Sequence, residues 1–72
     1  MPYGLYEHYK GHKYVVYGIA LHSETLEPFV QYHRFGNPAD NWVRPKHMFD
    51  EQVLKDGARV PRFKYLGPVP KP

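Results

Sequence analysis

The sequence predicts an all-β fold, a small antiparallel SH3-like barrel of five to six short strands with one short helical turn. Aromatic residues make up 17% of the 72 residues, which favours strands over helices in so short a chain. Short β-rich segments alternate with clusters of Gly, Asn, Asp and Pro that are typical of tight turns. An OB-fold is the alternative, although the sequence offers no good candidate for its helix between strands.

The first half of the chain predicts three strands. The segment "LYEHYKGHKY" is typical of a hairpin that turns at Lys10 and Gly11, and "KYVVYGIAL" over residues 13–21 is the clearest strand. Gly18 in the middle of that strand indicates a bend or bulge. The segment "HSETLE" is polar and turn-like, and a third strand then covers residues 29–33. Together these signals indicate an antiparallel meander.

The second half predicts a loop, a short strand, a helical turn and a last hairpin. By composition "FGNPADN" is a loop, and "NWVRP" is a short strand that ends at Pro45, followed by one helical turn over "PKHMF". Asp56 and Gly57 predict a hairpin turn, and Pro61 places the last strand at an edge or a bulge. We therefore expect one β-barrel domain over residues 1–66 and an extended, Pro-rich tail over residues 67–72.

The strand over residues 13–21 leaves its buried face undecided. Strict alternation puts Tyr14, Val16 and His22 on one face, and Val15, Tyr17 and Leu21 on the other. Bulk favours burial of the odd-numbered face, whereas burial of the even-numbered face would expose a row of apolar side chains that marks a partner or dimer surface. In the second case His22 would close the end of the core beneath Trp42 or Phe49.

Composition bounds the environment and the partners. The chain has no cysteine, no apolar run long enough to cross a bilayer and no signal peptide, so we expect a cytoplasmic protein without a membrane partner or a cofactor. Residues 1–41 hold three Lys/Arg against four Asp/Glu, a balance of −1, and residues 42–72 hold seven against three, a balance of +4. Nucleic acid or a small anionic ligand is therefore a partner to test, alongside a homodimer.

The polar cluster at His22, Ser23, Glu24 and Thr25 has the residue types of a hydrolase. A catalytic triad needs side chains that converge, but neighbours in an extended chain point to opposite faces, and no glycine-rich donor loop lies nearby. We expect a polar turn whose hydroxyls bind local backbone groups, and the sequence does not favour an enzyme. A metal site would need His22, His33 or His47 brought together by the fold, because His8 and His12 are about 13 Å apart on a strand.

The segment "NWVRPKHMF" carries the best single binding residue. Arg44 lies on a short strand before a rigid proline, which makes its guanidinium a fixed donor for phosphate or carboxylate. We expect Trp42, Met48 and Phe49 to be core residues, although an exposed Trp42 beside Arg44 would stack a base. The predicted binding rim adds Arg62 and Tyr32 to Arg44 and to the polar turn at residues 22–25.

Four segments together carry a resemblance to a known family: "HYKG", "YVVYGIALHSET", "WVRPKHMF" and "VPRFKYL". The chain resembles, from about Tyr6 to Leu66, the bacterial domain-of-unknown-function family numbered 1653. The resemblance implies a small cytoplasmic domain and supplies no reaction. We therefore expect a non-enzymatic binding module for an anionic or polar ligand, with an interaction or self-association domain that docks Pro-rich or extended segments as the alternative.

Overall fold

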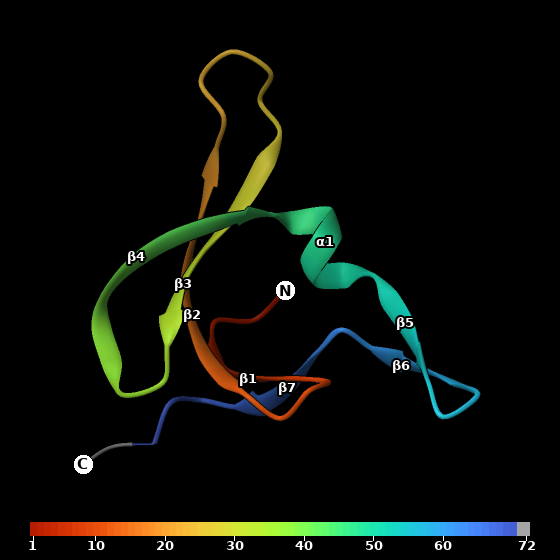
Figure 1. The fold of residues 1–72 in the computed structure, drawn as a ribbon. Coiled ribbons are helices and arrows are strands. Elements are labelled where there is room, and N and C mark those ends of the chain that lie inside the picture. The colour runs from red at the N-terminus through yellow and green to blue at the C-terminus, as the bar shows by residue number, and fades with distance from the viewer. Residues whose placement is uncertain (71–72) are drawn as a thin grey trace.

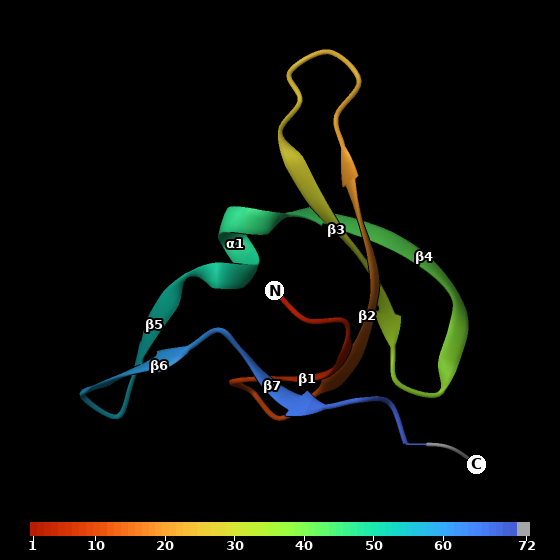
Figure 2. The same cartoon turned by 180° about the vertical axis from the view of Figure 1, so that it is seen from behind.

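The computed structural model describes residues 1–70, and within them the chain forms seven strands and one short helix (Figures 1 and 2). In chain order these are β1 (Gly4–His8), β2 (Lys13–Leu21), β3 (Pro28–Arg34), β4 (Asn37–Pro45), α1 (Lys46–Asp50), β5 (Gln52–Lys55), β6 (Ala58–Pro61) and β7 (Phe63–Gly67). The all-β class with one short helical turn is confirmed, with more strands than the five or six expected.

The strands form two antiparallel sheets that do not close into a barrel, so the barrel closure expected from the sequence is not formed. The larger sheet has the order β4-β3-β2-β1-β7, and β5 pairs with β6 in a separate hairpin. The single last strand expected from the sequence is split at Arg62, whose backbone N–H donates to the Glu51 carbonyl at 3.0 Å. Pro61, just before it, has no N–H to continue a ladder. As a result β6 stays with β5, and β7 alone returns to pair with β1.

Three local predictions are confirmed. The first hairpin turns between β1 and β2, and the helical turn follows Pro45 as α1. Asp56 and Gly57 join β5 to β6 with φ angles of 52° and 80°. Two consecutive residues with positive φ match the right-handed twist of hairpin strands, which is why Asp-Gly is favoured there.

The predicted loop over "FGNPADN" is wrong, because most of it belongs to β4. The turn is confined to Phe35 and Gly36, and the strand begins at Asn37. Gly36 has a φ of 84°, which allows so short a turn. Pro38 is tolerated because β4 is the end strand of the sheet, where one side of the strand needs no donor.

A β-bulge at Tyr17 decides which face of β2 is buried. Val16 pairs with Tyr32 of β3, but Gly18 pairs with the next residue, Gln31, so Tyr17 is the extra residue. Beyond the bulge Ile19 pairs with Val30, on the same face as Val16 and Tyr32. The bulge at Gly18 is thus confirmed, whereas strict alternation along the strand is wrong: the face toward Val30 and Tyr32 carries Val16 before the bulge and Ile19 after it. On the other face Val15 is also buried, at 7% exposure.

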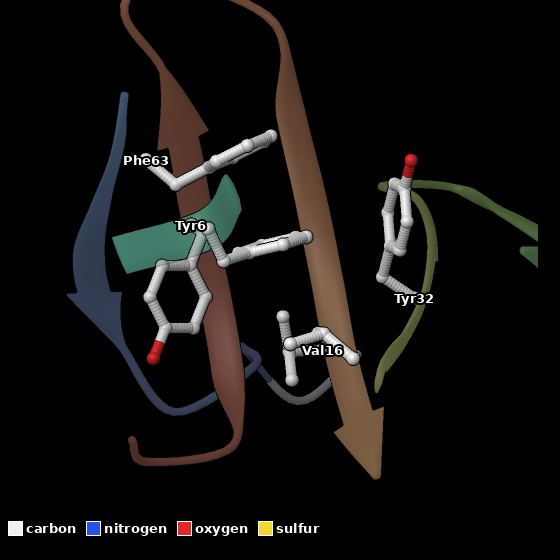
Figure 3. Close-up of a cluster of buried hydrophobic side chains, with 6 residues drawn as sticks. Tyr6, Val16, Tyr32 and Phe63 are labelled. Carbon is white, nitrogen blue, oxygen red and sulfur yellow. The ribbon is translucent and has the colours of Figure 1, made fainter. Parts of the chain in front are cut away.

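The core lies on one face of the large sheet, which we call the inner face. Figure 3 shows Tyr6, Val16, Tyr32 and Phe63 projecting from four strands into this interior. α1 adds Phe49, whose ring stacks on Phe63 with centroids 4.0 Å apart, and Val30 is fully buried. Phe49 is therefore the core residue that was expected from the sequence.

Two other expected core residues are not buried. Trp42 pairs with Tyr32 and so lies on the inner face, but its side chain is 40% exposed because β4 is the end strand. Met48 is only half-buried. The prediction of Trp42 as a core residue is therefore wrong, and aromatic residues of β1, β3 and β7 fill the core with Phe49.

The sheet reaches one residue into the predicted tail. Gly67 still pairs with Leu5 of β1, and residues 68–70 have no regular secondary structure. Residues 71–72 of the predicted tail lie outside the described residues. None of the helices in the described chain is long and apolar enough to span a membrane.

Candidate binding site on the inner face

A row of aromatic rings crosses the inner face of the large sheet. Starting at β1, the ring of His8 lies 5.0 Å from Phe63, and Phe63 lies 5.8 Å from Tyr14. Tyr14 lies 5.6 Å from Tyr32, which is 5.8 Å from Trp42 on β4. All four contacts are edge-to-face, an arrangement that the charge distribution of aromatic rings favours. We call these five side chains the aromatic row.

The row is accessible at its two ends and in the middle. Trp42 is 40% exposed, and Tyr14 and His8 are half-buried. Tyr32 and Phe63 are buried beneath them at 6% exposure each and hold the exposed rings in place. The row therefore offers rigid aromatic surfaces on which a planar ligand can stack.

Arg44 lies across the aromatic row. It pairs with Val30, which places its side chain on the inner face, and its Nε donates a hydrogen bond to the Tyr32 hydroxyl at 3.3 Å. Its guanidinium carbon is 5.8 Å from the centre of the Phe63 ring, within the range of a cation–π contact. Within residues 1–70 no carboxylate pairs with Arg44. The structure thus fixes a half-buried, uncompensated cation over aromatic rings.

The other arginines near the row are already paired. Arg34 forms a two-pronged ion pair with Asp40, at 2.7 Å and 3.0 Å, and lies 5.3 Å from the Trp42 ring. The hydrogen bond from Arg34 holds the pKa of the Asp40 carboxyl below its usual range, and Asp40 raises the pKa of Arg34. Arg34 therefore supports the exposed ring of Trp42 rather than offering a free charge.

Arg62 is paired in the same way at the other side of the site. Its terminal nitrogen lies 2.6 Å from the Glu51 carboxylate, and its carbonyl accepts the Tyr9 N–H at 3.0 Å. Its Nε is buried and has no hydrogen-bond partner in the described part of the chain. Arg62 thus joins the turn after β1 to the segment after α1, and it adds positive charge beside His8.

The polar turn at residues 22–25 lies away from this site, at the tip of the β2–β3 hairpin that projects beyond β4 (Figure 1). The N–H groups of Glu24 and Thr25 donate to Nδ1 of His22 at 3.2 Å and 3.3 Å, and the Thr25 hydroxyl accepts the Glu27 N–H at 3.2 Å. The predicted polar turn is confirmed. The prediction that His22 closes the core is wrong, because the side chain is exposed at the tip.

This turn does not assemble a catalytic triad. A nucleophilic serine must hydrogen-bond to the imidazole, but no hydrogen bond within residues 1–70 joins the side chains of His22, Ser23 and Glu24. The imidazole nitrogen that faces the turn instead accepts two backbone N–H groups. The chemistry of this cluster is local capping.

The histidines are spread over the molecule. His22 is at the hairpin tip, His47 is exposed on α1, and His33 stacks on Tyr17 on the face opposite the core, with centroids 5.7 Å apart. The part of the chain that the structure describes contains no group of three His, Asp or Glu side chains that could hold a metal ion.

Of the eight predicted site residues, the fold brings three to the inner face: Tyr32, Trp42 and Arg44. Arg62 lies between β6 and β7, near His8. Sequence reasoning missed His8, Tyr14 and Phe63. Their signal is alternation, because Tyr6 and His8 on one strand, and Tyr14 and Val16 on the next, put bulky side chains at every second position. Only the strand register places these positions on the face that carries Arg44.

Comparison with known proteins agrees with the resemblance in the sequence. The sequence model of the family described as "Protein of unknown function (DUF1653)" matches residues 4–65. A crystal structure of a protein belonging to DUF1653 from Bordetella bronchiseptica superposes with a TM-score of 0.83 at 34% identity, covering 100% of this chain and 95% of that chain. No curated protein matches the chain.

Proposed function

We propose that this chain, which belongs to the DUF1653 family of proteins of unknown function, is a non-enzymatic binding module that holds an anionic ligand at Arg44. The observation that carries the proposal is the position of the Arg44 guanidinium, which lies over aromatic rings without a carboxylate partner in the described chain. A half-buried charge of this kind is costly to leave unpaired, and a bound anion would compensate it.

The geometry of Arg44 suits a phosphate or a carboxylate. The Tyr32 hydroxyl occupies Nε, and the two terminal nitrogens make no hydrogen bond within residues 1–70. A planar guanidinium that presents two terminal nitrogens binds two oxygens of one anion at once. The contacts with Tyr32 and Phe63 restrict the side chain, so that less entropy is lost on binding.

The aromatic row indicates that the anion carries a planar group. Exposed Trp42 and half-buried Tyr14 lie beside Tyr32, the ring to which Arg44 is hydrogen-bonded. Stacking of a base on an aromatic side chain contributes about 1–3 kcal/mol and tolerates any base. A nucleotide or nucleic acid, or a metabolite with a ring and an acidic group, meets both requirements.

The test is an amide NMR titration with a short single-stranded oligonucleotide of mixed sequence, at low and at moderate salt. We expect shifts at Tyr14, Tyr32, Trp42 and Arg44 that fade as salt rises, because phosphate contacts depend on counterion release. Arg44→Ala should weaken binding at least tenfold, and Arg44→Lys should restore only part of it, since lysine lacks the two-pronged geometry.

Arg59→Ala is the matched control, because Arg59 is an exposed arginine on β6, away from the aromatic row. It removes the same charge and should change affinity little. Arg44→Ala should also lower the free energy of unfolding by only about 1 kcal/mol, from the lost hydrogen bond and cation–π contact. Equal affinities for Arg44→Ala and Arg59→Ala, with this oligonucleotide and with a panel of aromatic carboxylates, would refute the proposal.

A second candidate function is self-association through an open sheet edge. Within the described residues β7 pairs only with β1, so its other edge is open to an added strand. Tyr65 and Leu66 on β7 are exposed, and the Pro-rich segment begins directly after Gly67. Removal of residues 68–72 should shift the protein from dimer to monomer in sedimentation velocity, and an unchanged state would discard this candidate.

A further inference from the structure

A second surface feature adjoins the aromatic row. A groove of about 840 Å³ lies between the β1–β2 turn and the β5–β6 hairpin. Its less polar lining residues are Tyr9, Val60 and Pro61. His8 lines the groove and is also the first member of the aromatic row, with its ring 4.5 Å from Tyr9 and 5.0 Å from Phe63. The groove therefore meets the row at His8, while its Glu7 and Lys64, which pair across β1 and β7, lie on the opposite face of the sheet.

Three lysines from three elements surround this groove: Lys10, Lys55 and Lys64. Lys55 donates to the Tyr9 carbonyl at 3.1 Å, and the Lys10 ammonium lies 5.9 Å from the centre of the Tyr9 ring. Within residues 1–70 none of the three forms an ion pair, and Glu7 is the one carboxylate in the lining. The groove thus has a net positive charge of two before His8 is counted.

His8 lies close to several positively charged side chains. Burial lowers the pKa of the His8 imidazole, and the nearby charges of Arg62, Lys10, Arg44 and His12 lower it further. These charges come from the β1–β2 turn, from the segment between β6 and β7, and from β4. His8 is therefore influenced by positive charges of both the Arg44 site and the groove.

We propose that the groove is a phosphate-binding subsite continuous with the Arg44 site, and that the ligand is single-stranded nucleic acid. This inference rests on the proposed function and extends it. Bases would stack on Trp42 and Tyr14, one phosphate would bind Arg44, and the following phosphates would lie among Lys10, Lys55 and Lys64. Accessible rings next to a group of cations suit an unpaired strand, whose bases are free to stack, better than a duplex.

The length of the site separates nucleic acid from a single metabolite. Four successive ring-to-ring steps of 5.0–5.8 Å lead from Trp42 to His8, and the groove begins there. A mononucleotide can occupy one subsite, whereas a chain of several nucleotides can occupy both. Small β-domains that bind single strands cover about 4–16 nucleotides.

The experiment measures the affinity of thymidylate oligomers of about two, four and eight nucleotides by fluorescence anisotropy, between about 50 and 200 mM salt. The groove variant carries Lys10→Gln, Lys55→Gln and Lys64→Gln. The control variant loses the same charge elsewhere, through Lys13→Gln, Lys46→Gln and Arg59→Gln. Far-UV circular dichroism confirms that both variants keep the fold.

We expect affinity to rise with oligomer length in the native protein, by at least tenfold from the shortest to the longest. The groove variant should lose this gain, and its salt slope for the longest oligomer should be shallower by about 2, because each phosphate contact with a single strand contributes about 0.7. The control variant should keep the gain. In the native protein the longest oligomer should also raise the His8 pKa, which NMR reads directly.

Other outcomes overturn the inference in distinguishable ways. If the shortest oligomer binds through Arg44 but length adds nothing, or if both triple variants weaken binding equally, the groove is not a subsite, and the proposed function stands. If no oligomer binds while aromatic carboxylates bind through Arg44, nucleic acid is the wrong ligand class. If a glutamate-rich peptide of matched charge binds the groove as tightly as the longest oligomer, the groove recognises acidic protein segments instead.

Discussion

The tip of the β2–β3 hairpin and the inner face at Arg44 both hold residues that sequence reasoning selected, and the fold treats them differently. At the tip, His22 accepts the N–H groups of Glu24 and Thr25, so the imidazole stabilises the turn itself. On the inner face, Arg44 is held by Tyr32 and Phe63 but keeps two terminal nitrogens without a partner in the described chain. A histidine or arginine indicates a binding site only when some of its hydrogen-bonding groups have no partner within the protein.

The largest expected effect is a loss of stability caused by a substitution in the core of the inner face. Phe49 is buried against Tyr6, Tyr32 and Phe63, so Phe49→Ala removes the ring on which the aromatic row rests. Loss of a buried phenylalanine costs about 3–5 kcal/mol, much of the stability of a domain this small. Urea unfolding followed by circular dichroism measures this loss.

Leu26→Ala is the control for that experiment, because Leu26 lies at the hairpin tip and its side chain is 64% exposed. It should change the free energy of unfolding by no more than about 0.5 kcal/mol. A similar loss from both substitutions would mean that the tip and the inner face form one packed unit, and the contrast between them would be lost.

An intermediate effect separates turn stability from binding. His22→Ala removes the acceptor of two backbone N–H groups and should lower the free energy of unfolding by about 1 kcal/mol, while oligonucleotide affinity stays unchanged. Ser23→Ala is the matched control, since no hydrogen bond of the described chain uses the Ser23 hydroxyl. A tenfold loss of affinity in His22→Ala would mean that the hairpin tip is part of the binding site.

Local signals in the sequence predicted local structure well. Asp56 and Gly57 specify their own turn, and Pro45 precedes the helical turn because its fixed φ suits that position. The polar turn at residues 22–25 is likewise closed by bonds between neighbours. In each case the stabilising contacts lie within a few residues, so the local sequence contains the necessary information.

The composition of the inner face could not be predicted in the same way, because it depends on register between distant strands. The bulge at Tyr17 reverses the alternation of β2, and further shifts occur between Leu5 and Tyr6 and between Tyr32 and Arg34. Each shift of one residue moves a strand's side chains to the other face. Arg44 was selected from its type and its proline neighbour, but the rings that surround it come from strands far apart in the sequence.

The smallest expected effect concerns His8, where the aromatic row meets the groove. Burial lowers the folded-state pKa of His8, and the charged groups Arg62, Lys10, Arg44 and His12 lower it further. The other charged residues that line the groove with His8 are Glu7, Lys55 and Lys64. The unfolded chain therefore binds a proton more readily than the folded chain does. Stability from this residue is complete above the unfolded pKa of about 6.5 and is lost as the pH falls below it.

His8→Gln, which cannot be protonated in this range, should flatten the fall in urea midpoint between about pH 7 and pH 5.5. A bound phosphate would oppose the positive field, so oligonucleotide affinity should rise as the pH falls through the same range, and only in proteins that keep His8. Equal pH dependence of affinity in His8→Gln and in the native protein would place the phosphates away from the groove.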